Sequence, residues 1–446
     1  MQIVKPFGRP DLSRDPSSHS AATSPVGVKR AAFSATIGNM LEFYDFITYA
    51  FFAIQIGHTF FPAQSEYGSL MLSLATFGAG FITRPIGGVV LGIYSDRIGR
   101  RPAMLLSFAL MGTAIIVIAI TPSYNAIGLA APIIVIIARM LQGFALGGEV
   151  GPTTAYLLEI APPERRALVI SLQPTSQEIA ATTGALVGLI LTQMMTPAEL
   201  ESYGWRVAFL IGALALPFGF WMRRTLPETV LPAERGAERT EASGHLTQAR
   251  RHGRVILLAL MILASGTIST YVTQYMTTYA QSTLRVAPSI AFATSLVSNG
   301  LQIVGALLGG WLADRYGRKP IMIAPQAIVL LLTYPAFLWI VGTPGGWSLL
   351  LGFGALSLIS ALPFTAFYAT FTEVLPQRIR GGVFATVYAV AIAIFGGTAQ
   401  LVVTWLLHVS GNPLAPAWYL LLAAAVGLLA MSRLPETAPM KDSQST

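Results

Sequence analysis

The stretch GIYSDRIGRRP (residues 92–102) returns in the second part of the chain as GWLADRYGRKP (residues 310–320). Each copy holds one Asp, three basic residues and two Gly, and each lies between long apolar runs. The same charged loop in the same apolar setting indicates a shared structural role. The repetition predicts that the chain consists of two related parts.

Two further pairs of segments support this duplication. LLEIAPPERR (157–166) and FTEVLPQRIR (371–380) share Glu, Pro and Arg at the same spacing. The pentapeptide TLPET at 225–229 is matched by RLPET at 433–437. Because the matched signals follow one another in the same order, we predict two homologous halves.

The composition is that of a membrane protein. Of the 446 residues, 54% are hydrophobic and only 11% are charged, whereas soluble domains carry roughly 25% charged residues. A spanning helix needs about 20 apolar residues. We therefore predict an all-α membrane protein with twelve transmembrane helices in two homologous six-helix bundles, the helices lying near 32–56, 68–94, 103–121, 129–158, 167–195, 205–222, 255–282, 287–313, 321–342, 345–372, 381–408 and 414–432.

The polar segments divide the chain into five parts. Most of the 28 Lys and Arg residues fall on one side of the predicted spans, as the positive-inside rule requires when both termini are cytoplasmic. The net charge of +8 is therefore topological and does not indicate a nucleic-acid partner. The predicted parts are a disordered cytoplasmic tail (1–31), the first bundle (32–222), a cytoplasmic linker (223–254), the second bundle (255–432) and a cytoplasmic tail (433–446).

Ionisable residues inside the predicted spans gather in the first half: Glu42, Asp45, Arg84, Arg139, Glu149 and Glu178. Placing such a group at mid-membrane costs about 2.5–3.5 kcal/mol on insertion scales, so each is a functional candidate. The acids outnumber the guanidiniums, and an unpaired carboxyl in an apolar setting readily binds a proton.

This excess of acid predicts proton coupling through Glu42, Asp45, Glu149 and Glu178. We expect Asp45 or Glu42 to carry the proton, with Arg139 as its counter-charge. The alternative is a set of structural ion pairs, for instance between Arg84 and Glu149.

An anionic substrate requires positive charge in its site, and Arg139 and Arg84 are the candidates. Neutral side chains would complete the site, namely Gln173, Gln177, Tyr271, Gln274, Tyr275, Asn299 and Gln302. Tyr271, Tyr275 and Tyr279 recur every four residues and so share one stripe of a helix. Tyrosines in helices also serve in packing, which is the other interpretation of this stripe.

Two six-helix bundles with GxxxDRxGRR and GxxxDRxGRK loops at equivalent places resemble the major facilitator superfamily. The resemblance implies that the halves rock around a site at the bilayer midplane. It also implies a cytoplasmic latch, in which Asp96 reaches the helix start near Gly381 and Asp314 reaches the one near Ala167.

In such a latch Arg97 would meet Glu159, and Arg315 would meet Glu373. Gly92 and Gly310 would allow close helix approach, and Arg100 and Arg318 complete the set of gating candidates. The simpler alternative is a topology anchor made of positive-inside charge.

Within the superfamily, GNMLEFYDFITY (38–49) and ARMLQGFALGGEVG (138–151) resemble the metabolite:proton symporters, which move citrate, other carboxylates, shikimate, proline or betaine. HTFFPAQSEYGSLML (58–72) and VTQYMTTY (272–279) are most similar to the citrate–proton and tricarballylate symporters. The resemblance puts Glu42, Asp45, Arg84, Arg139, Gln142, Glu149, Tyr275 and Asn299 at family-like positions.

Glu178 departs from the citrate members, which as a rule carry an uncharged Gln at its position. A carboxylate there would repel a trianion and favour a smaller or less charged acid.

Other classes of function are less compatible with the sequence. An enzyme would need a nucleophile or metal motif, and the chain has no cysteine, phosphate loop, His-x-x-x-His or Gly-x-Ser-x-Gly. A membrane sensor on the same fold would need a larger soluble domain, and passive uniport leaves the excess acids unexplained.

We therefore predict a proton-coupled symporter that imports citrate or a related di- or tricarboxylate. The alternative substrates are shikimate, 2-oxoglutarate, proline and betaine, and betaine would need an aromatic box. We expect a monomer in the plasma (inner) membrane, surrounded by lipid, with the proton as coupling ion and no other cofactor or metal.

Overall fold

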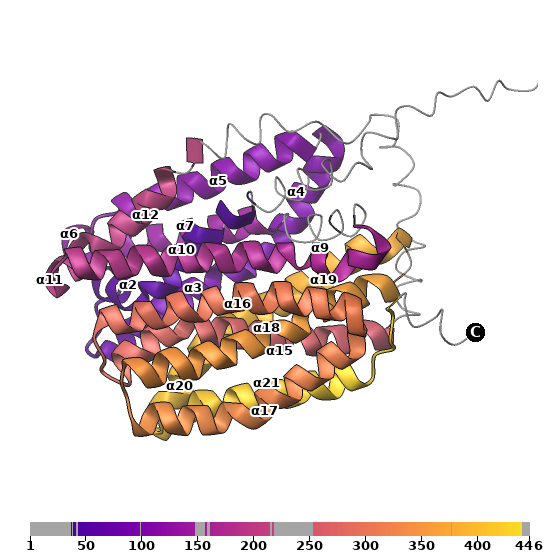
Figure 1. Ribbon diagram of the computed structural model, residues 1–446. Coiled ribbons are helices and arrows are strands. Elements are labelled where there is room, and N and C mark those ends of the chain that lie inside the picture. Colours follow the sequence, from indigo (N-terminus) through magenta and orange to yellow (C-terminus); the bar gives the residue numbers. More distant parts are fainter. Residues whose placement is uncertain are drawn as a thin grey trace, which may run out of the picture.

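The computed structural model describes residues 37, 39–41, 43–98, 100–147, 157, 161–214, 216–217, 253–375 and 377–438. Within these residues each of the twelve predicted spans contains helix. The predicted tail 1–31 and nearly all of the linker 223–254 lie outside the described residues. The helices run side by side along one long axis, with both repeated loops at the same end (Figure 1).

The first half begins with a helix over residues 37–60, described with gaps and ending as α2 (Ala53–Phe60). Ser65 then caps the next helix, because its side chain accepts a hydrogen bond from the backbone N–H of Gly68. The remaining helices of this half are α3 (Glu66–Ile82), α4 (Arg84–Ile98), α5 (Arg100–Ile120), α6 (Tyr124–Ile127), α7 (Ala130–Leu146), α9 (Arg166–Ile170), α10 (Leu172–Met194), α11 (Pro197–Glu199) and α12 (Trp205–Leu214).

The second half consists of longer helices. They are α15 (Gly253–Ser282), α16 (Pro288–Tyr316), α17 (Arg318–Gly342), α18 (Gly346–Val374), α19 (Gln377–Ala391), α20 (Gly397–Ser410) and α21 (Ala415–Ser432). A π-helical turn, Ile392–Gly396, joins α19 to α20. Among the described residues, eight helices are long and apolar enough to cross a membrane.

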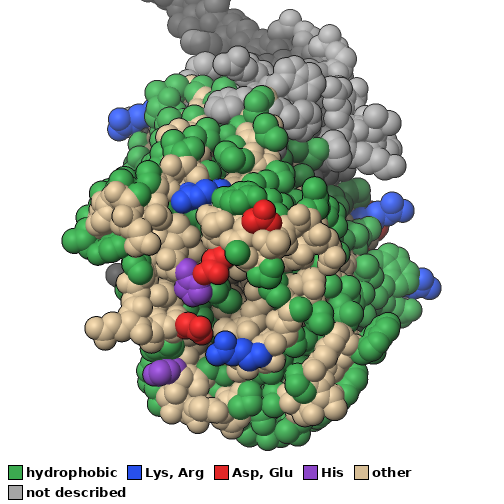
Figure 2. Space-filling model, turned by 90° about the vertical axis from the view of Figure 1, so that its left-hand side faces the viewer, with side chains coloured by type: hydrophobic (Ala, Val, Ile, Leu, Met, Phe, Trp, Pro, Cys, Tyr) green, Lys and Arg blue, Asp and Glu red, His purple; other side chains and the backbone are tan. Residues whose placement is uncertain are grey.

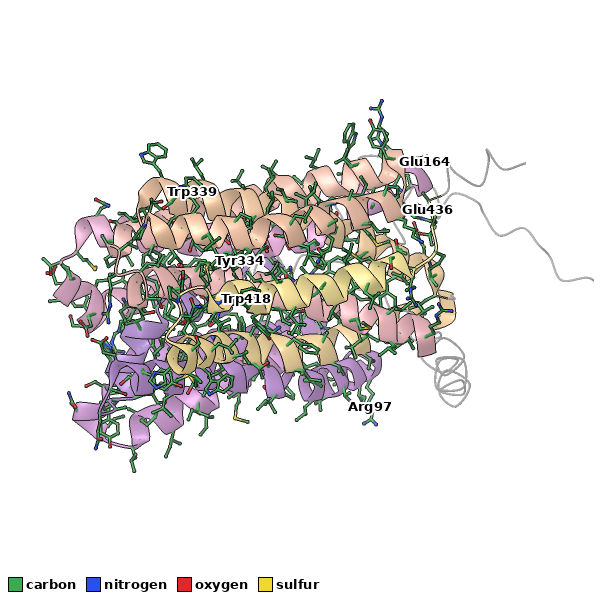
Figure 3. All side chains as sticks on the ribbon, turned by 90° about the horizontal axis from the view of Figure 1, so that it is seen from below. Arg97, Glu164, Tyr334, Trp339, Trp418 and Glu436 are labelled. Atoms are coloured by element: carbon green, nitrogen blue, oxygen red, sulfur yellow. The ribbon has the colours of Figure 1, made fainter. Side chains whose placement is uncertain are left out.

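Side chains on the outside of the bundle suit a lipid environment. Trp339 projects outward from α17, and the rings of Tyr334 and Trp418 lie 4.9 Å apart on neighbouring helices (Figure 3). The end opposite the repeated loops is more polar, with His, acidic and basic side chains on one face (Figure 2). There Nδ1 of His58 lies 2.7 Å from Oε1 of Glu201.

The two halves meet where small residues let their backbones approach. Helix α3 packs on α20, and α10 packs on α16. A Cβ added to Gly78 of α3 would lie 2.6 Å from the carbonyl oxygen of Gly397 in α20. Real Cβ atoms do not come this close, so Gly78 fixes how tightly the halves pack here.

We predict that Gly78→Ala destabilises this packing, because the added methyl group would overlap the Gly397 carbonyl. Overpacking of this kind costs about 1–3 kcal/mol. Gly300→Ala is the control, since a Cβ on Gly300 meets open space. Thermal unfolding in detergent should give a lower Tm for Gly78→Ala only, and equal Tm values would contradict the close crossing.

Candidate functional site

A cavity lies between the two halves. The space open to water-sized molecules is about 80 Å³, less than the roughly 300–1,000 Å³ of typical ligand pockets. The cavity must therefore widen to hold a metabolite. The first helix and α10 contribute from one half, and α15, α16, α18 and α19 contribute from the other. Its polar wall consists of Gln177, Glu178, Thr267, Ser269, Thr270, Tyr271, Gln274, Gln302, Ser360, Thr365, Tyr368 and Tyr388.

Glu178 is the one charged residue among the described residues that line this cavity. It is partly buried on α10 and faces helices of the other half. Its neighbour Gln177 donates a hydrogen bond from Nε2 to the hydroxyl oxygen of Tyr388, at 3.5 Å, across the interface between the halves. A carboxyl group at such a wall, with no described charge beside it in the lining, can bind and release a proton.

Neutral groups with unused hydrogen-bonding capacity surround the acid. Oε1 of Gln274 is buried and has no partner among the described residues. Gln302 also lines the cavity, and its Nε2 donates to Oδ1 of Asn299 at 3.4 Å. Asn299 lies behind it, fully buried.

The tyrosine stripe divides between lining and packing roles. Tyr271 lines the cavity and packs edge-on against Phe81, with ring centroids 5.2 Å apart. The hydroxyl of Tyr275 accepts a hydrogen bond from Thr404 at 2.9 Å, and Tyr279 donates to the carbonyl of Pro413 at 2.6 Å. In this arrangement only Tyr271 of the stripe faces the cavity. A binding role is therefore open to Tyr271, whereas Tyr275 and Tyr279 have packing roles.

Arg139 does not lie at the cavity wall, contrary to the expected direct contact with a substrate. It is fully buried, and its Cζ lies 4.3 Å from the ring centroid of Phe46 and 4.4 Å from that of Tyr49. One guanidinium nitrogen donates to Oε1 of Gln142 at 2.7 Å. Aromatic rings therefore solvate most of this cation.

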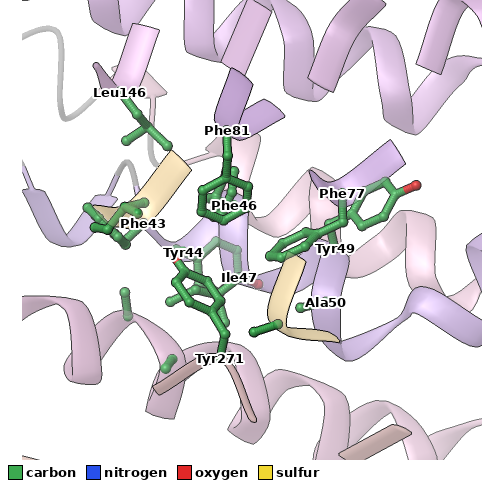
Figure 4. Close-up of a cluster of buried hydrophobic side chains, with 14 of the residues drawn as sticks. Phe43, Tyr44, Phe46, Ile47, Tyr49, Ala50, Phe77, Phe81, Leu146 and Tyr271 are labelled. Atoms are coloured by element: carbon green, nitrogen blue, oxygen red, sulfur yellow. The ribbon is translucent and has the colours of Figure 1, made fainter. Parts of the chain in front are cut away.

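Arg84 is held in the same way. Its Cζ lies 4.3 Å from the ring centroid of Phe46 and 4.4 Å from that of Phe81. It too is buried and absent from the cavity wall. The two cations therefore lie against a cluster of aromatic side chains, and Figure 4 shows Phe46, Phe77, Phe81, Tyr49 and Tyr271 of this cluster. Tyr271 of the cluster also lines the cavity.

Both arginines keep buried nitrogens without partners. For Arg84 and for Arg139, Nε and one terminal nitrogen make no hydrogen bond among the described residues. Glu42 and Glu149, two of the acids expected near them, lie outside the described residues.

Asp45 lies inside the first bundle. Its side chain is buried, and Oδ1 has no partner among the described residues. It faces α12 at Gly212, where any added side chain would collide with Oδ1. No ion pair joins Asp45 to Arg139 in this arrangement, and Oδ1 of Asp45 and two nitrogens of Arg139 are left without described partners. The role of Arg139 as counter-charge to Asp45 or Glu42 stays a prediction, because Glu42 lies outside the described residues.

Gln173 faces the first helix and does not line the cavity. The carbonyl oxygen of Gln173 and the hydroxyl of Ser176 accept hydrogen bonds from Nδ2 of Asn39, at 3.5 and 2.7 Å. The side chain of Gln173 is buried. Of the two glutamines predicted on this helix, Gln177 is the one at the cavity.

The second copy of the repeated loop joins the halves as predicted. Oδ1 and Oδ2 of Asp314 accept hydrogen bonds from the backbone N–H groups of Ala167 and Leu168, at 3.0 and 2.9 Å. These are unpaired groups at the beginning of α9, where a negative charge is favoured. A Cβ on Gly310 would lie 2.9 Å from the carbonyl oxygen of Ala167, so Gly310 permits the close approach.

Arg318 replaces Arg315 in the predicted pair with Glu373. The guanidinium of Arg318 lies 3.1 Å from Oε1 of Glu373 and 2.7 Å from Oδ1 of Asp314. Gly317, with φ of 103°, turns the chain so that Arg318 folds back over Asp314. Arg315 is exposed and lies near the rings of Trp311 and Tyr316.

Glu436 is a further member of this contact that the sequence reasoning missed. Its carboxylate accepts the backbone N–H groups of Arg318 and Lys319, at 2.8 and 3.0 Å, which begin α17. Burial disfavours the charged form, but the backbone donors prevail and hold the pKa of Glu436 below its ordinary value. The next residue, Thr437, donates to Oε2 of Glu373 at 2.6 Å. The signal was present in the sequence, since Glu436 belongs to the repeated RLPET segment.

The first copy of the loop is less close-packed. A Cβ on Gly92 would meet no described atom within 4 Å, so the expected close approach is not seen among the described residues. Arg97 is exposed at the surface of α4 (Figure 3). Glu159 and the side chains of Asp96 and Arg100 lie outside the described part of the chain.

Comparison with known proteins identifies the family. The Major Facilitator Superfamily pattern matches residues 35–395. The citrate-proton symporter of Salmonella typhi is 35% identical, over 93% of this chain and 96% of that protein. The alpha-ketoglutarate permease of Escherichia coli (strain K12) is 32% identical, over 90% of this chain and 92% of the permease.

Solved structures support the same fold. The xylose transporter XylE from E. coli, in a partially occluded inward open conformation, superposes with a TM-score of 0.72. It covers 92% of this chain and 98% of its own, at 18% sequence identity. With a family pattern over most of its length and relatives over nine-tenths of it, this multi-pass membrane protein belongs to the major facilitator superfamily.

Proposed function

We propose that the protein is a proton-coupled symporter that imports a small organic acid, citrate or a related di- or tricarboxylate, by alternating access. The observation that carries the proposal is the carboxylate of Glu178, the one Asp or Glu among the described residues that line the cavity between the halves. Citrate members as a rule carry Gln at this position, so coupling through Glu178 would be particular to this chain. The named activities of the relatives, citrate–proton symport and alpha-ketoglutarate permease, support an acid as substrate. The repeated-loop end is cytoplasmic, and the protein works as a monomer in the inner membrane.

Glu178 couples the proton to the substrate through charge. An ionised Glu178 repels an anion in the cavity, and a protonated Glu178 does not. Two unit charges about 8 Å apart interact by ~2 kcal/mol at an effective dielectric constant of about 20. Proton and anion therefore each favour binding of the other, by about thirtyfold.

The buried arginines supply the positive potential. Arg84 and Arg139 contribute two cations against the aromatic cluster, without an ion pair to a described acid. They attract an anion into the cavity although neither lines its wall in this arrangement. Asp45, buried with an unpaired oxygen, is the second candidate proton carrier.

Betaine stays the alternative substrate. A quaternary ammonium group needs free aromatic faces, and Phe43, Tyr271, Phe364, Tyr368 and Tyr388 line the cavity. The protein's own guanidiniums lie over other rings, those of Phe46, Tyr49 and Phe81.

The contact of Asp314 with α9 works as a latch on the cytoplasmic face. It joins the halves through two backbone hydrogen bonds, and Arg318 ties it to Glu373. Opening the cavity to the cytoplasm separates these groups. The alternative, a topology anchor, predicts no effect of Asp314 on turnover.

Uptake into proteoliposomes tests the function. Labelled citrate and 2-oxoglutarate are offered with and without an inward proton gradient, and tricarballylate, succinate, shikimate and betaine compete. We expect that a proton gradient drives uptake and that di- or tricarboxylates inhibit this uptake. Uptake that only betaine or proline inhibits would overturn the choice of an acid.

Glu178→Gln makes the cavity permanently neutral at this position. We expect it to abolish accumulation driven by a proton gradient, while exchange of labelled for unlabelled substrate continues. The control is Glu66→Gln, an exposed acid at the opposite end that lies 3.7 Å from Arg285. Wild-type accumulation in Glu178→Gln would transfer the role to Asp45 or Glu42.

Asp314→Asn keeps the shape of the latch but removes its charge. Charge-assisted hydrogen bonds are about twice as strong as neutral ones, so we expect turnover to fall about tenfold, equivalent to ~1.4 kcal/mol. Substrate affinity should stay within about twofold of wild type. Arg315→Gln, at the exposed neighbouring position, is the control. Wild-type turnover in Asp314→Asn would favour the topology anchor.

Glu436→Gln should lower stability in a pH-dependent manner. The folded pKa of Glu436 is lowered, so its stabilisation is complete above the unfolded pKa of about 4.3 and is lost as pH falls through the folded value. A charge at a helix beginning contributes about 0.3–1 kcal/mol. The difference in Tm between wild type and variant should be present at pH 7 and shrink at pH 4. A difference that is constant across this range would contradict the assignment.

A further inference from the structure

A second cavity lies inside the second bundle, among α15, α17, α18 and α21. The space open to water-sized molecules is about 30 Å³, room for a group the size of one or two waters. No Asp, Glu, Lys or Arg stands among its described lining residues, and hydroxyl groups interrupt a mainly apolar wall. The polar lining residues are Ser265, Ser269, Thr273, Gln326, Thr333, Ser357 and Ser360.

This side cavity adjoins the central one. Ser269 of α15 and Ser360 and Phe364 of α18 line both cavities. The ring of Phe364 lies against Gly266, where an added Cβ would be 2.5 Å from Cε1 of the ring. The aromatic ring therefore occupies the boundary between the two spaces, and Gly266 makes room for it.

Helix α18 is able to bend beside this ring. Pro363 lies inside the helix directly before Phe364. Proline has no N–H to donate to the carbonyl of Ile359, so the helix loses one hydrogen bond at this point. A small change of bend would move the ring relative to Gly266.

Part of the polar wall is already engaged, and part is free. Nε2 of Gln326 donates to Ser265 and to the carbonyl of Ala424, and Thr333 donates to its own helix. The hydroxyl groups of Ser269 and Ser357 make no hydrogen bond with another described residue. Such a wall can pair a neutral polar group, whereas an unpaired charge would be strongly disfavoured there.

We propose that the side cavity receives an uncharged polar end of the substrate, a hydroxyl or a protonated carboxyl group, and that Phe364 determines what passes into it. This inference rests on the proposed symport of an organic acid. The charged end of the substrate remains in the central cavity, on the side of the buried arginines. Specificity then depends on residues of the neutral half as well as on Glu178.

Thiol accessibility tests the dividing role of Phe364 without any substrate. The chain has no cysteine, so Ser357→Cys introduces a single thiol into the side cavity. Its rate of reaction with methyl methanethiosulfonate should rise at least tenfold when Phe364→Ala is added, and less with Phe364→Leu. Ser295→Cys is the matched control, because Ser295 is buried against Thr277 and lines neither cavity. An equal rate for Ser357→Cys with Phe and with Ala at 364 would overturn the divider.

Competition by paired acids tests the occupant. Citrate and tricarballylate differ by one hydroxyl group, so each is used against uptake of a labelled acid. In Ser357→Ala and Ser360→Ala, a rise of about fivefold in the inhibition constant of citrate alone supports a hydroxyl occupant. A similar rise for both supports a carboxyl occupant. Constants within twofold of wild type for both acids would overturn the proposal.

The thiol experiment and the competition experiment distinguish a failure of this inference from a failure of the proposed function. Absence of acid uptake in the wild-type protein would overturn the proposed function and, with it, the occupant. The thiol rates would still decide whether Phe364 separates the two cavities.

Discussion

A charge inside a bilayer must find a partner, a proton or water, and this constraint organises the described structure. Asp314 meets it with backbone N–H groups of the other half. Arg84 and Arg139 meet it with aromatic faces. Glu178 meets it by lying at a cavity. Each solution has a different consequence. The contacts of Asp314 hold the halves together. The two arginines create a positive potential inside the first bundle, and Glu178 is placed where proton exchange is possible.

The two homologous halves carry different kinds of side chain. In the spans predicted from the sequence, the Asp, Glu and Arg residues lie in the first half, and the second half lines the cavities with hydroxyl, amide and aromatic groups. A substrate held between them contacts one charged and one neutral surface. In the proposed mechanism the proton controls binding from one side, while shape and hydrogen bonding select the substrate from the other.

Small residues determine where the halves come together. Lipid competes with apolar side chains for contact, so helices in a membrane gain mainly from close backbone packing. Gly78 opposite Gly397, and Gly310 opposite Ala167, provide such packing at two levels of the interface. Gly92, the equivalent of Gly310 in the first half, has no such contact with a described residue.

The sequence by itself determined the membrane setting, the two homologous halves and the helix start that Asp314 reaches, because hydropathy, repeats and local motifs encode these directly. The tertiary structure decided the rest. In the folded chain, Arg318 and not Arg315 is the partner of Glu373. Asp45 faces α12. Aromatic rings surround Arg139, which does not line the cavity. The tertiary structure also left Glu178 as the acid at the cavity wall and opened a second, neutral cavity beside it. Spacing along one helix gives depth and face, but a side chain's surroundings depend on distant helices whose packing no single segment records.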